Sequence, residues 1–371
     1  MIWLEPVSFA EAPFEIIDGD RGKNYPKQDE FHGSGHCLFL SATNVTKSGF
    51  DFSTCQFIDE KKDAALNKGK LQREDIVLTT RGTIGNTAYF NDAVAFDHLR
   101  INSGMVILRC DRNKLLPAFL YHFLRSPSFY SQANGLRSGV AQPQLPIRDM
   151  RQVRLPLPSL PEQCRIAGIL SAYDELIENN QRRIRILEDM ARSLYREWFV
   201  HFRYPGHELV PLVDSPLGQI PQGWEVKKLK EICNLTMGSS PKSEFYNETG
   251  EGQPFHQGVT NFGDRFPTDR LFCTVEGRIA EGGDILFSVR APVGRMNIAD
   301  KKIIIGRGLS AIHHKAGHQA FLWEQLCAKF TEVDMMGNGA IFASVTKDDM
   351  QGIELLCPAE QVIKAATHHF K

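Results

Sequence analysis

Two kinds of hydrophobic pattern follow one another along the chain in no regular order. Short runs rich in β-branched residues, bounded by Gly, Asn or Asp, predict strands at IVLTT (76–80), MVILR (105–109), DILFS (284–288) and KKIIIG (301–306). Apolar residues at helical spacing predict amphipathic helices at 116–131 and 319–330. Because strands and helices do not alternate as a βαβ series would require, the predicted fold class is α+β.

A third pattern occupies the middle of the chain. Residues recur there at alternating steps of four and three, which is a heptad seam formed by Ile166, Leu170, Tyr173, Ile177, Asn180, Ile184, Leu187, Ala191, Leu194 and Trp198. Ser159 and Glu162 form a capping-box start, and Pro205-Gly206 ends the helix. At ~1.5 Å per residue, a helix over 162–200 is roughly 58 Å long. A helix of this length is too long to be a packing element of one small domain. The seam predicts a partner helix, against which the polar Asn180 can fix the register.

The sequence also matches itself. DIVLTTRGTIG (75–85) corresponds without a gap to DILFSVRAPVG (284–294), and SGVAQPQLPIRDM (138–150) to NGAIFASVTKDDM (338–350). Two shorter matches, 43–44 with 260–261 and 161–163 with 359–361, keep the same order. A repeat of about 200 residues is a duplicated domain. The predicted organisation is a first domain at 1–158, a central helix at 159–204, a linker at 205–216, a second domain at 217–357 and the start of a short helix at 358–371.

Composition narrows the class of protein. A chain of 371 residues, 42% hydrophobic and 23% charged, is long enough for two folded domains. We predict a cytoplasmic protein, because the chain shows no secretory leader and no apolar run that could span a bilayer. The eight cysteines are scattered, and the paired histidines are adjacent in sequence, so no metal site is predicted. The net charge of −1 means that a DNA-binding function requires clustered basic residues or help from other subunits.

The central segment resembles a known family. The stretch LPLPSLPEQCRIAGILSAYDELIENNQRRIRILEDMARSLYREWFVHFRYPGHE (155–208) is similar to the central conserved region of Type I restriction-modification specificity subunits, with the Pro-x-x-Glu-Gln opening, the Asp-x-x-Ile-x-x-Asn middle and the Glu-Trp-Phe ending. TTRGTIGN, RINSGM and LGQIPQGWEVKKL also resemble segments of these proteins. The resemblance implies two target recognition domains held apart by long antiparallel helices. Each domain would read one half of a bipartite, asymmetric site on double-stranded DNA.

The resemblance also implies partners. Modification subunits, which carry S-adenosylmethionine and methylate adenine, would dock on the central helix, and restriction subunits would hydrolyse ATP. This chain should itself bind no cofactor and catalyse nothing, since it lacks an Asn-Pro-Pro-aromatic motif, a phosphate loop and a G-x-G-x-x-G fingerprint. The chain departs from the family pattern in its second helix, which should match the first in length. The segment CPAEQVIKAATHHFK supplies only about three turns, and Lys364 and His368 fall at positions where the first helix has apolar residues. Two interpretations stay open, a truncated helix or a helix supplied by another chain.

The candidate DNA-binding residues lie in the predicted loops. Arg pairs with guanine and Asn or Gln with adenine, while hydroxyl groups and backbone N–H groups hold phosphates. In the first domain the candidates are Arg21, Lys23, Thr79, Thr80, Arg81, Thr83, Asn86, Arg100, Asn102, Ser103, Arg137, Ser138, Gln142 and Gln144. In the second domain they are Ser239, Ser240, Lys242, Ser288, Arg290, Arg295, Arg307 and Asn338.

The two copies help to sort these candidates. Arg81 and Arg290 are equivalent although the two domains should read different sequences, which favours a phosphate contact or a structural ion pair with Asp75 and Asp284 over base reading. Positions that differ between the copies, such as Asn86 and Arg295, are better candidates for specificity. Two rival functions remain, a structural adaptor without DNA binding and a self-contained methyltransferase or nuclease. The missing motifs disfavour the second rival.

The length of the central helix generates a testable prediction. Inserting four residues after Asn180 should lengthen the helix by about 6 Å, close to two base pairs, and rotate one domain relative to the other. The gap between the two half-sites should change while each half-site keeps its sequence, as measured by mapping modified adenines. An unchanged gap would show that the helix does not set the spacing.

Overall fold

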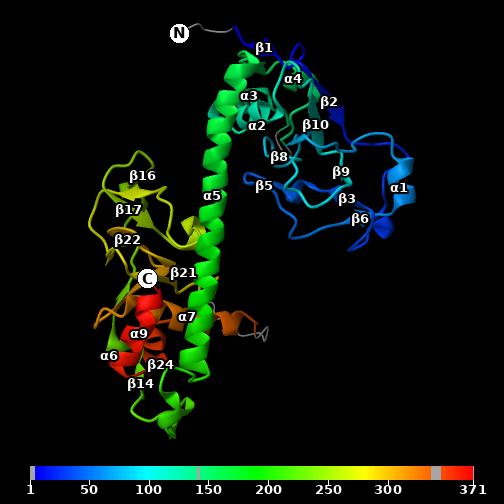
Figure 1. Cartoon of the computed structure of the whole chain (residues 1–371). Coiled ribbons are helices and arrows are strands. Elements are labelled where there is room, and N and C mark those ends of the chain that lie inside the picture. Colours follow the sequence, from blue (N-terminus) through cyan, green and yellow to red (C-terminus); the bar gives the residue numbers. More distant parts are fainter. Residues whose placement is uncertain (1–4, 140–142, 336–343, 371) are drawn as a thin grey trace. The chain divides into compact units, whose positions relative to one another are not determined.

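The computed structural model describes residues 5–139, 143–335 and 344–370. The chain forms two compact units, Met1–Asn180 and Gln181–Lys371. The division falls inside the long helix α5 (Leu160–Tyr195), so each unit contains one domain and one part of this helix (Figure 1).

A four-stranded antiparallel sheet forms the centre of the first unit. Its order is β2 (Phe14–Asp18), β10 (Met105–Cys110), β7 (Ile76–Thr79) and β8 (Thr87–Tyr89). A three-stranded sheet, β6 (Phe57–Ile58), β3 (Cys37–Leu40) and β9 (Leu99–Ile101), contains a parallel pair, β3 with β9. Strands β4 (Val45–Thr46) and β5 (Gly49–Phe50) pair with each other, as do β1 (Val7–Ser8) and β11 (Arg154–Leu155). The strands predicted at 76–80 and 105–109 are confirmed.

Both faces of the four-stranded sheet are buried. Ile76 and Leu78 of β7 pack into a core with residues of three helices. These helices are α2 (Pro117–Leu124), α3 (Pro127–Leu136) and α4 (Ile147–Met150). Val77 faces the opposite core, formed with residues of β3 and β9. Side chains alternate across a strand, so a strand covered on both faces is apolar throughout. This explains the unbroken apolar run in the sequence. The remaining helix, α1 (Glu60–Ala65), precedes β7.

The second unit repeats this architecture. Its four-stranded sheet has the order β15 (Cys233–Met237), β23 (Leu309–His314), β20 (Ile285–Ser288) and β21 (Met296–Ile298), again antiparallel. The parallel pair recurs as β17 (Gln253–His256) with β22 (Ile303–Ile305), in a sheet with β16 (Tyr246–Asn247), β18 (Phe272–Cys273) and β19 (Ile279–Ala280). The pair β14 (Glu225–Lys228) with β24 (Glu354–Cys357) matches β1 with β11. The α+β class and the repeat are confirmed.

The second unit contains a further hairpin and four further α-helices among its described residues. They are the hairpin β12 (Leu212–Ser215) and β13 (Gly218–Pro221), and the helices α6 (Leu229–Ile232), α7 (Gln319–Met335), α8 (Lys347–Gly352) and α9 (Glu360–Phe370). Ile363 and Ala366 of α9 are buried in an aromatic cluster with Tyr195, Phe199 and Phe321. The short last helix therefore packs within its own unit.

Helix α5 begins as the sequence predicts. The backbone N–H and hydroxyl group of Ser159 donate to the Glu162 carboxylate (3.0 and 2.7 Å), which is half of a capping box. A π-helical segment, Arg196–Val200, follows Tyr195, so the predicted helix is confirmed with boundaries shifted by a few residues. The domain limits at 158 and 217 stay predictions. Within the described ranges, no helix is both long enough and apolar enough to cross a bilayer.

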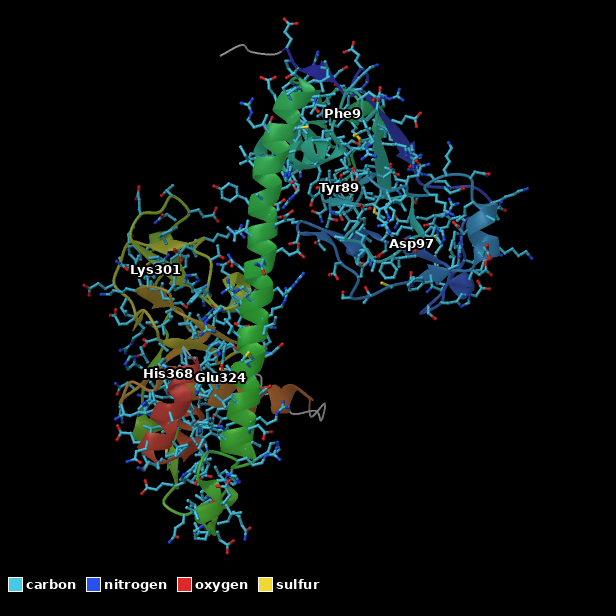
Figure 2. All side chains as sticks on the ribbon, in the orientation of Figure 1. Phe9, Tyr89, Asp97, Lys301, Glu324 and His368 are labelled. Carbon is cyan, nitrogen blue, oxygen red and sulfur yellow. The ribbon has the colours of Figure 1, made fainter. Side chains whose placement is uncertain are left out.

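A buried carboxyl group lies between α7 and α5. Glu324 of α7, labelled in Figure 2, is only 8% exposed, and the charges of Arg192, Arg265 and Glu188 act on it. Burial raises the pKa of Glu324 to about 7, and the two arginines only partly oppose this effect. The folded state therefore binds a proton at this carboxyl group more tightly than the unfolded chain does.

This pKa shift predicts how the stability of the second unit depends on pH. A carboxyl group with a raised folded pKa lowers stability as pH rises from its ordinary value of 4.5 towards 7. Glu324→Gln should raise the free energy of unfolding at pH 8 by about 1–3 kcal/mol and have little effect at pH 4.5. Urea denaturation followed by tryptophan fluorescence tests this, because Trp198, Trp224 and Trp323 all belong to this unit. A less stable variant at pH 8 would contradict it.

Candidate nucleic-acid interface

Strand direction brings four loops of each domain to one edge of the sheets. Both β2 and β7 run antiparallel to β10, so the residues after β2 and β7 meet the residues before β10. The parallel pair β3 and β9 adds the residues after Leu40, since the Asn102 N–H donates to the Leu40 carbonyl oxygen (3.2 Å). We call this region the loop edge. It comprises 19–24, 41–44, 80–86 and 102–104 in the first domain, and 238–242, 257–261, 289–295 and 306–308 in the second.

The same backbone contacts join these loops in both domains. The Thr80 N–H donates to the Gly104 carbonyl oxygen (2.9 Å), and the Val289 N–H donates to that of Gly308 (2.9 Å). A Cβ atom on Gly19 would collide with the Asn102 carbonyl oxygen, and one on the equivalent Gly238 would collide with that of Gly306. Only glycine allows this close approach, so the two copies hold their loops in the same way.

The hydroxyl groups at the base of one loop are used internally. Thr79 and Ser288 are equivalent and fully buried. The Ser288 hydroxyl group donates to the Pro292 carbonyl oxygen (2.7 Å) and accepts from the Arg295 N–H (2.8 Å), and the Thr79 hydroxyl group makes the matching bonds to Thr83 and Asn86. Both side chains close the turn after the strand. We therefore remove these two residues from the candidate DNA contacts.

The equivalent arginines lie on the loop edge. The half-exposed Arg81 forms a β-bridge with Gln144, and its Nη2 donates to Gln144 Oε1 (3.4 Å). Arg290 is exposed and bridges Ser344 in the same way. The backbones of Arg81 and Arg290 therefore occupy matching places on the two loop edges.

The ion pairs considered for these arginines are wrong, because other residues hold the two carboxylates. Asp75 pairs with Arg109 (2.7 Å), and Asp284 pairs with His313 (2.8 Å). Arg109 and His313 occupy equivalent positions on β10 and β23. The repeat thus preserves a side-chain contact to the aspartate at this place, from arginine in one copy and from histidine in the other, which the sequence comparison did not reveal. Arg81 and Arg290 remain available for contacts outside the domain.

Arg100 is a structural residue rather than a surface contact. Its side chain is 5% exposed and forms an ion pair with Asp63, which is 4% exposed. Its Nη1 and Nη2 atoms donate to the carbonyl oxygens of Lys68, Asp63 and Leu66. Burial raises the pKa of Asp63, but hydrogen bonds from Lys70 and Arg100 outweigh burial, and the net pKa is lowered. We correct the sequence interpretation and remove Arg100 from the candidate interface.

The remaining candidates divide into loop-holding and exposed residues. Thr80 donates to Gly104, Asn86 donates to Val45, and Asn102 accepts from the Gly104 N–H, so all three organise the loops. Asp20 adds to this support, because a hydrogen bond from the Gly22 N–H lowers its pKa and keeps it ionised. The other described candidates are exposed or half-exposed, namely Lys23, Thr83, Ser103, Arg137, Ser138, Gln144, Ser239, Lys242 and Arg295. Gln142 and Asn338 lie outside the described residues.

The two loop edges differ by an exchange of arginine and serine. Strand register makes Arg21 equivalent to Ser240, and Ser103 equivalent to Arg307. Arg21 Nη2 donates to the Ser103 carbonyl oxygen (3.2 Å), and the Arg307 N–H donates to the Ser240 hydroxyl group (3.2 Å). Each domain thus places one arginine at this junction, from opposite loops.

One exposed residue at the second junction was missed by sequence reasoning. Gln257 Oε1 accepts from the Ser240 hydroxyl group (2.9 Å), which leaves the Gln257 side-chain amide nitrogen as a donor. The register of the parallel strands makes Gln257 equivalent to Ser41. The weak sequence match between 43–44 and 260–261, only a few residues away, was the available signal for this loop.

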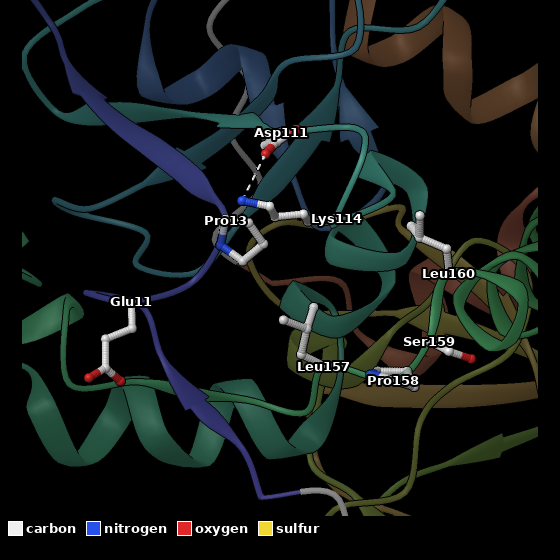
Figure 3. A pocket seen from close by; sticks show the side chains of 8 residues that line it. All are labelled: Glu11, Pro13, Asp111, Lys114, Leu157, Pro158, Ser159 and Leu160. Carbon is white, nitrogen blue, oxygen red and sulfur yellow. Dashed lines mark ion pairs between the residues drawn. The ribbon is translucent and has the colours of Figure 1, made fainter.

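A cavity of about 530 Å³ lies elsewhere in the first unit, at the start of α5 (Figure 3). Its lining includes Asp111 and Lys114, which form an ion pair (3.7 Å), and Pro158 and Ser159 before the helix. None of its lining residues belongs to the loop edge. In the part of the chain that the structure describes, no three His, Cys, Asp or Glu residues are arranged to hold a metal ion.

The seam of α5 is largely exposed. Ile166, Leu170, Tyr173, Ile177, Ile184 and Leu187 are each 40–61% exposed, and Asn180 is exposed. The last residues of the seam are less exposed. Leu194 is half-buried, and Trp198 packs on His369 in the aromatic cluster. The exposed part of the seam predicted for partner subunits therefore ends before Ala191, which is buried in the second unit.

A different side of α5 packs on the first unit. Gln163 is buried and accepts from the Leu116 N–H (2.8 Å), His122 hydrogen-bonds to Ser171 (3.0 Å), and Arg125 pairs with Asp174. The exposed seam is therefore not the face that holds α5 to this domain.

Comparisons with known proteins agree on one family. The family described as the Type I restriction modification DNA specificity domain matches residues 14–189 and 221–367. The putative type I restriction enzyme MjaX specificity subunit of Methanocaldococcus jannaschii is 30% identical over 88% of this chain and 78% of its own length. The MjaIX specificity subunit of the same organism is 29% identical over 62% of this chain and 49% of its own.

A solved structure is similar in fold. The type I restriction-modification system S subunit from M. genitalium has a TM-score of 0.58 at 16% identity, covering 98% of this chain and 87% of that one.

The buried Arg100 pair predicts a stability effect. Arg100→Met should lower the free energy of unfolding of the first domain by about 3–5 kcal/mol, because the buried Asp63 would keep Lys70 but lose its buried cationic partner, and three backbone carbonyl oxygens would lose their donor. The contribution of Asp63 is present above its ordinary pKa of 3.8 and is lost as pH falls through the lower folded value. Arg112→Met is the control, since the Arg112 side chain is 67% exposed and pairs with the half-buried Glu74 (3.2 Å). Equal effects of both substitutions in chemical denaturation would contradict the structural role.

Proposed function

This chain belongs to the family of Type I restriction-modification DNA specificity subunits, and we propose that each of its domains reads one half of a bipartite, asymmetric site on double-stranded DNA. The observation that carries this proposal is the loop edge, built twice with the same backbone contacts but with different exposed side chains. A common scaffold with changed side chains suits two readers of different sequences.

Equivalent residues serve the task that both domains share. Arg81 and Arg290 occupy matching positions at the loop edge, as do Lys23 and Lys242. Phosphates are the same in every sequence, so residues that do not change between the copies suit phosphate contacts. These positive charges also give each domain basic residues at its own loop edge, in a chain whose net charge is −1.

Residues that differ between the copies serve specificity. Arg21 in the first domain and Arg307 in the second approach the same junction from different loops, so they would meet different base pairs. Arginine bonds in a bidentate manner to guanine, and a glutamine such as Gln257 to adenine. We assign base reading to Arg21, Arg307 and Gln257.

The other activities of such a system would come from partner subunits. Modification subunits would bind along the exposed part of α5 and methylate adenine with S-adenosylmethionine, and restriction subunits would hydrolyse ATP. We assign no catalytic residue and no cofactor to this chain. Incubating the chain alone with DNA and a labelled methyl donor tests the enzymatic alternative, and a gel shift with modification subunits present tests the adaptor alternative.

The junction arginines give a prediction for each half-site. Arg21→Ser should relax the preferred sequence of one half-site, and Arg307→Ser that of the other, at about 1–3 kcal/mol for each lost bidentate contact. Selection from a randomised DNA library, with modification subunits present, measures both preferences. Arg81→Ala should instead weaken binding to all sequences and lower the salt dependence by about one phosphate contact.

Arg112→Ser provides the matched control. Arg112 is a surface arginine of the same domain, beyond the other end of β10, so its loss should leave both preferences unchanged. Changes in both half-sites from either junction variant would defeat the assignment of one half to each domain.

A further inference from the structure

A further loop of the first domain borders its loop edge. Residues 66–69 follow α1 (Figure 1), and the chain after them runs antiparallel to β9. The Ile101 N–H donates to the Gly69 carbonyl oxygen (2.9 Å), so the residues before Gly69 meet the residues after Ile101. A Cβ atom on Gly69 would lie only 3.3 Å from the Cα atom of Gly19. The 66–69 loop therefore lies against two of the loops that form the loop edge.

Two buried ions hold the backbone of this loop from inside the domain. Arg100 donates from Nη1 to the Lys68 carbonyl oxygen (2.7 Å) and from Nη2 to that of Leu66 (3.1 Å). The Asp20 carboxylate, in a residue that is 7% exposed, accepts from the Asn67 N–H (2.8 Å). Hydrogen bonds to charged groups are stronger than those between neutral groups. The loop backbone is therefore fixed through both its carbonyl and its N–H groups.

The two polar side chains of the 66–69 loop are not used within the domain. Asn67 and Lys68 are both exposed. In the described part of the chain, neither the Asn67 side-chain amide nor the Lys68 ammonium group has a hydrogen-bond or ion-pair partner. A binding site requires side chains that are free and a backbone that is already in place. The loop meets both requirements.

The second domain differs at this place. Strand register places Glu276 and Gly277 where the first domain has the asparagine and the lysine, and Ile304 where it has the buried arginine. The carboxylate of the exposed Glu276 would repel DNA phosphates, whereas an ammonium group attracts them. A DNA contact by this loop is therefore a property of the first domain alone.

We infer that the 66–69 loop is a further DNA-contacting loop of the first domain, in which Asn67 reads an adenine and Lys68 holds a phosphate. The asparagine amide both donates and accepts, which matches the N6 and N7 atoms that adenine presents in the major groove. The ammonium group of lysine binds phosphate as a point charge. The inference rests on the proposed function, because it adds an adenine to the half-site that the first domain reads.

Selection from a randomised DNA library, with modification subunits present, tests the asparagine. Asn67→Ala should reduce the preference for adenine at one position by roughly tenfold, in the same half-site that Arg21→Ser alters, and leave the other half-site unchanged. Asn113→Ala is the matched control, since Asn113 is also exposed but lies beyond the other end of β10, and it should change no position. The circular dichroism spectrum should be the same for all of these variants.

The outcomes separate this inference from the recognition proposal. If Arg21→Ser alters a half-site and Asn67→Ala alters none, or alters the other half-site, the inference is wrong and the recognition proposal stands. If neither variant alters any position, the recognition proposal fails as well.

The salt dependence of DNA binding tests the lysine. Lys68→Ala should reduce the slope of the logarithm of the binding constant against the logarithm of the salt concentration by about 0.9, the value for one phosphate contact, without changing the base preference. Lys114→Ala is the matched control, because Lys114 follows Asn113 as Lys68 follows Asn67, is 70% exposed and lies away from the loop edge. An unchanged slope for Lys68→Ala, or equal effects of the two substitutions, would overturn the phosphate contact.

Discussion

The antiparallel pairing of one central strand with its two neighbours is the constraint on which the structure depends. In the first domain β10 pairs with β2 and β7, and in the second β23 pairs with β15 and β20. Backbone hydrogen bonds fix the register, and the register decides which loop residues meet at the edge. A slip of one residue would turn the buried Ile76 and Leu78 to the other face and separate Arg21 from Ser103. Packing and recognition are therefore set by the same interactions.

The duplicated framework allows the two domains to diverge where DNA would be read. Gly19 and Gly238 permit the same close loop contact, and Thr79 and Ser288 close the same turn. Asp75 keeps a cationic partner in one copy and Asp284 keeps a histidine in the other. Since these supports lie beneath the loop edge, exposed residues can change without loss of the fold. Arg21 and Arg307 illustrate such a change, because the arginine has moved from one loop to another.

Local pattern predicted the strands, the central helix and the repeat, because these depend on neighbours in sequence. The environment of single residues could not be predicted in the same way. Arg100 has the polar context of a loop residue, yet its partner Asp63 lies 37 positions away and buries it. Arg109 was not singled out, because its pairing with Asp75 depends on the register of two distant strands. Gln257 joins Ser240 only through the parallel pairing of β17 with β22.

The central claim is that two similar loop edges read two different half-sites of one DNA sequence. Mapping methylated adenines across the genome of a cell that contains this chain and its modification and restriction partners tests it most directly. The account predicts one new methylated motif, with two unlike halves separated by bases of no fixed identity. A continuous motif, two identical halves or no new methylation would contradict it.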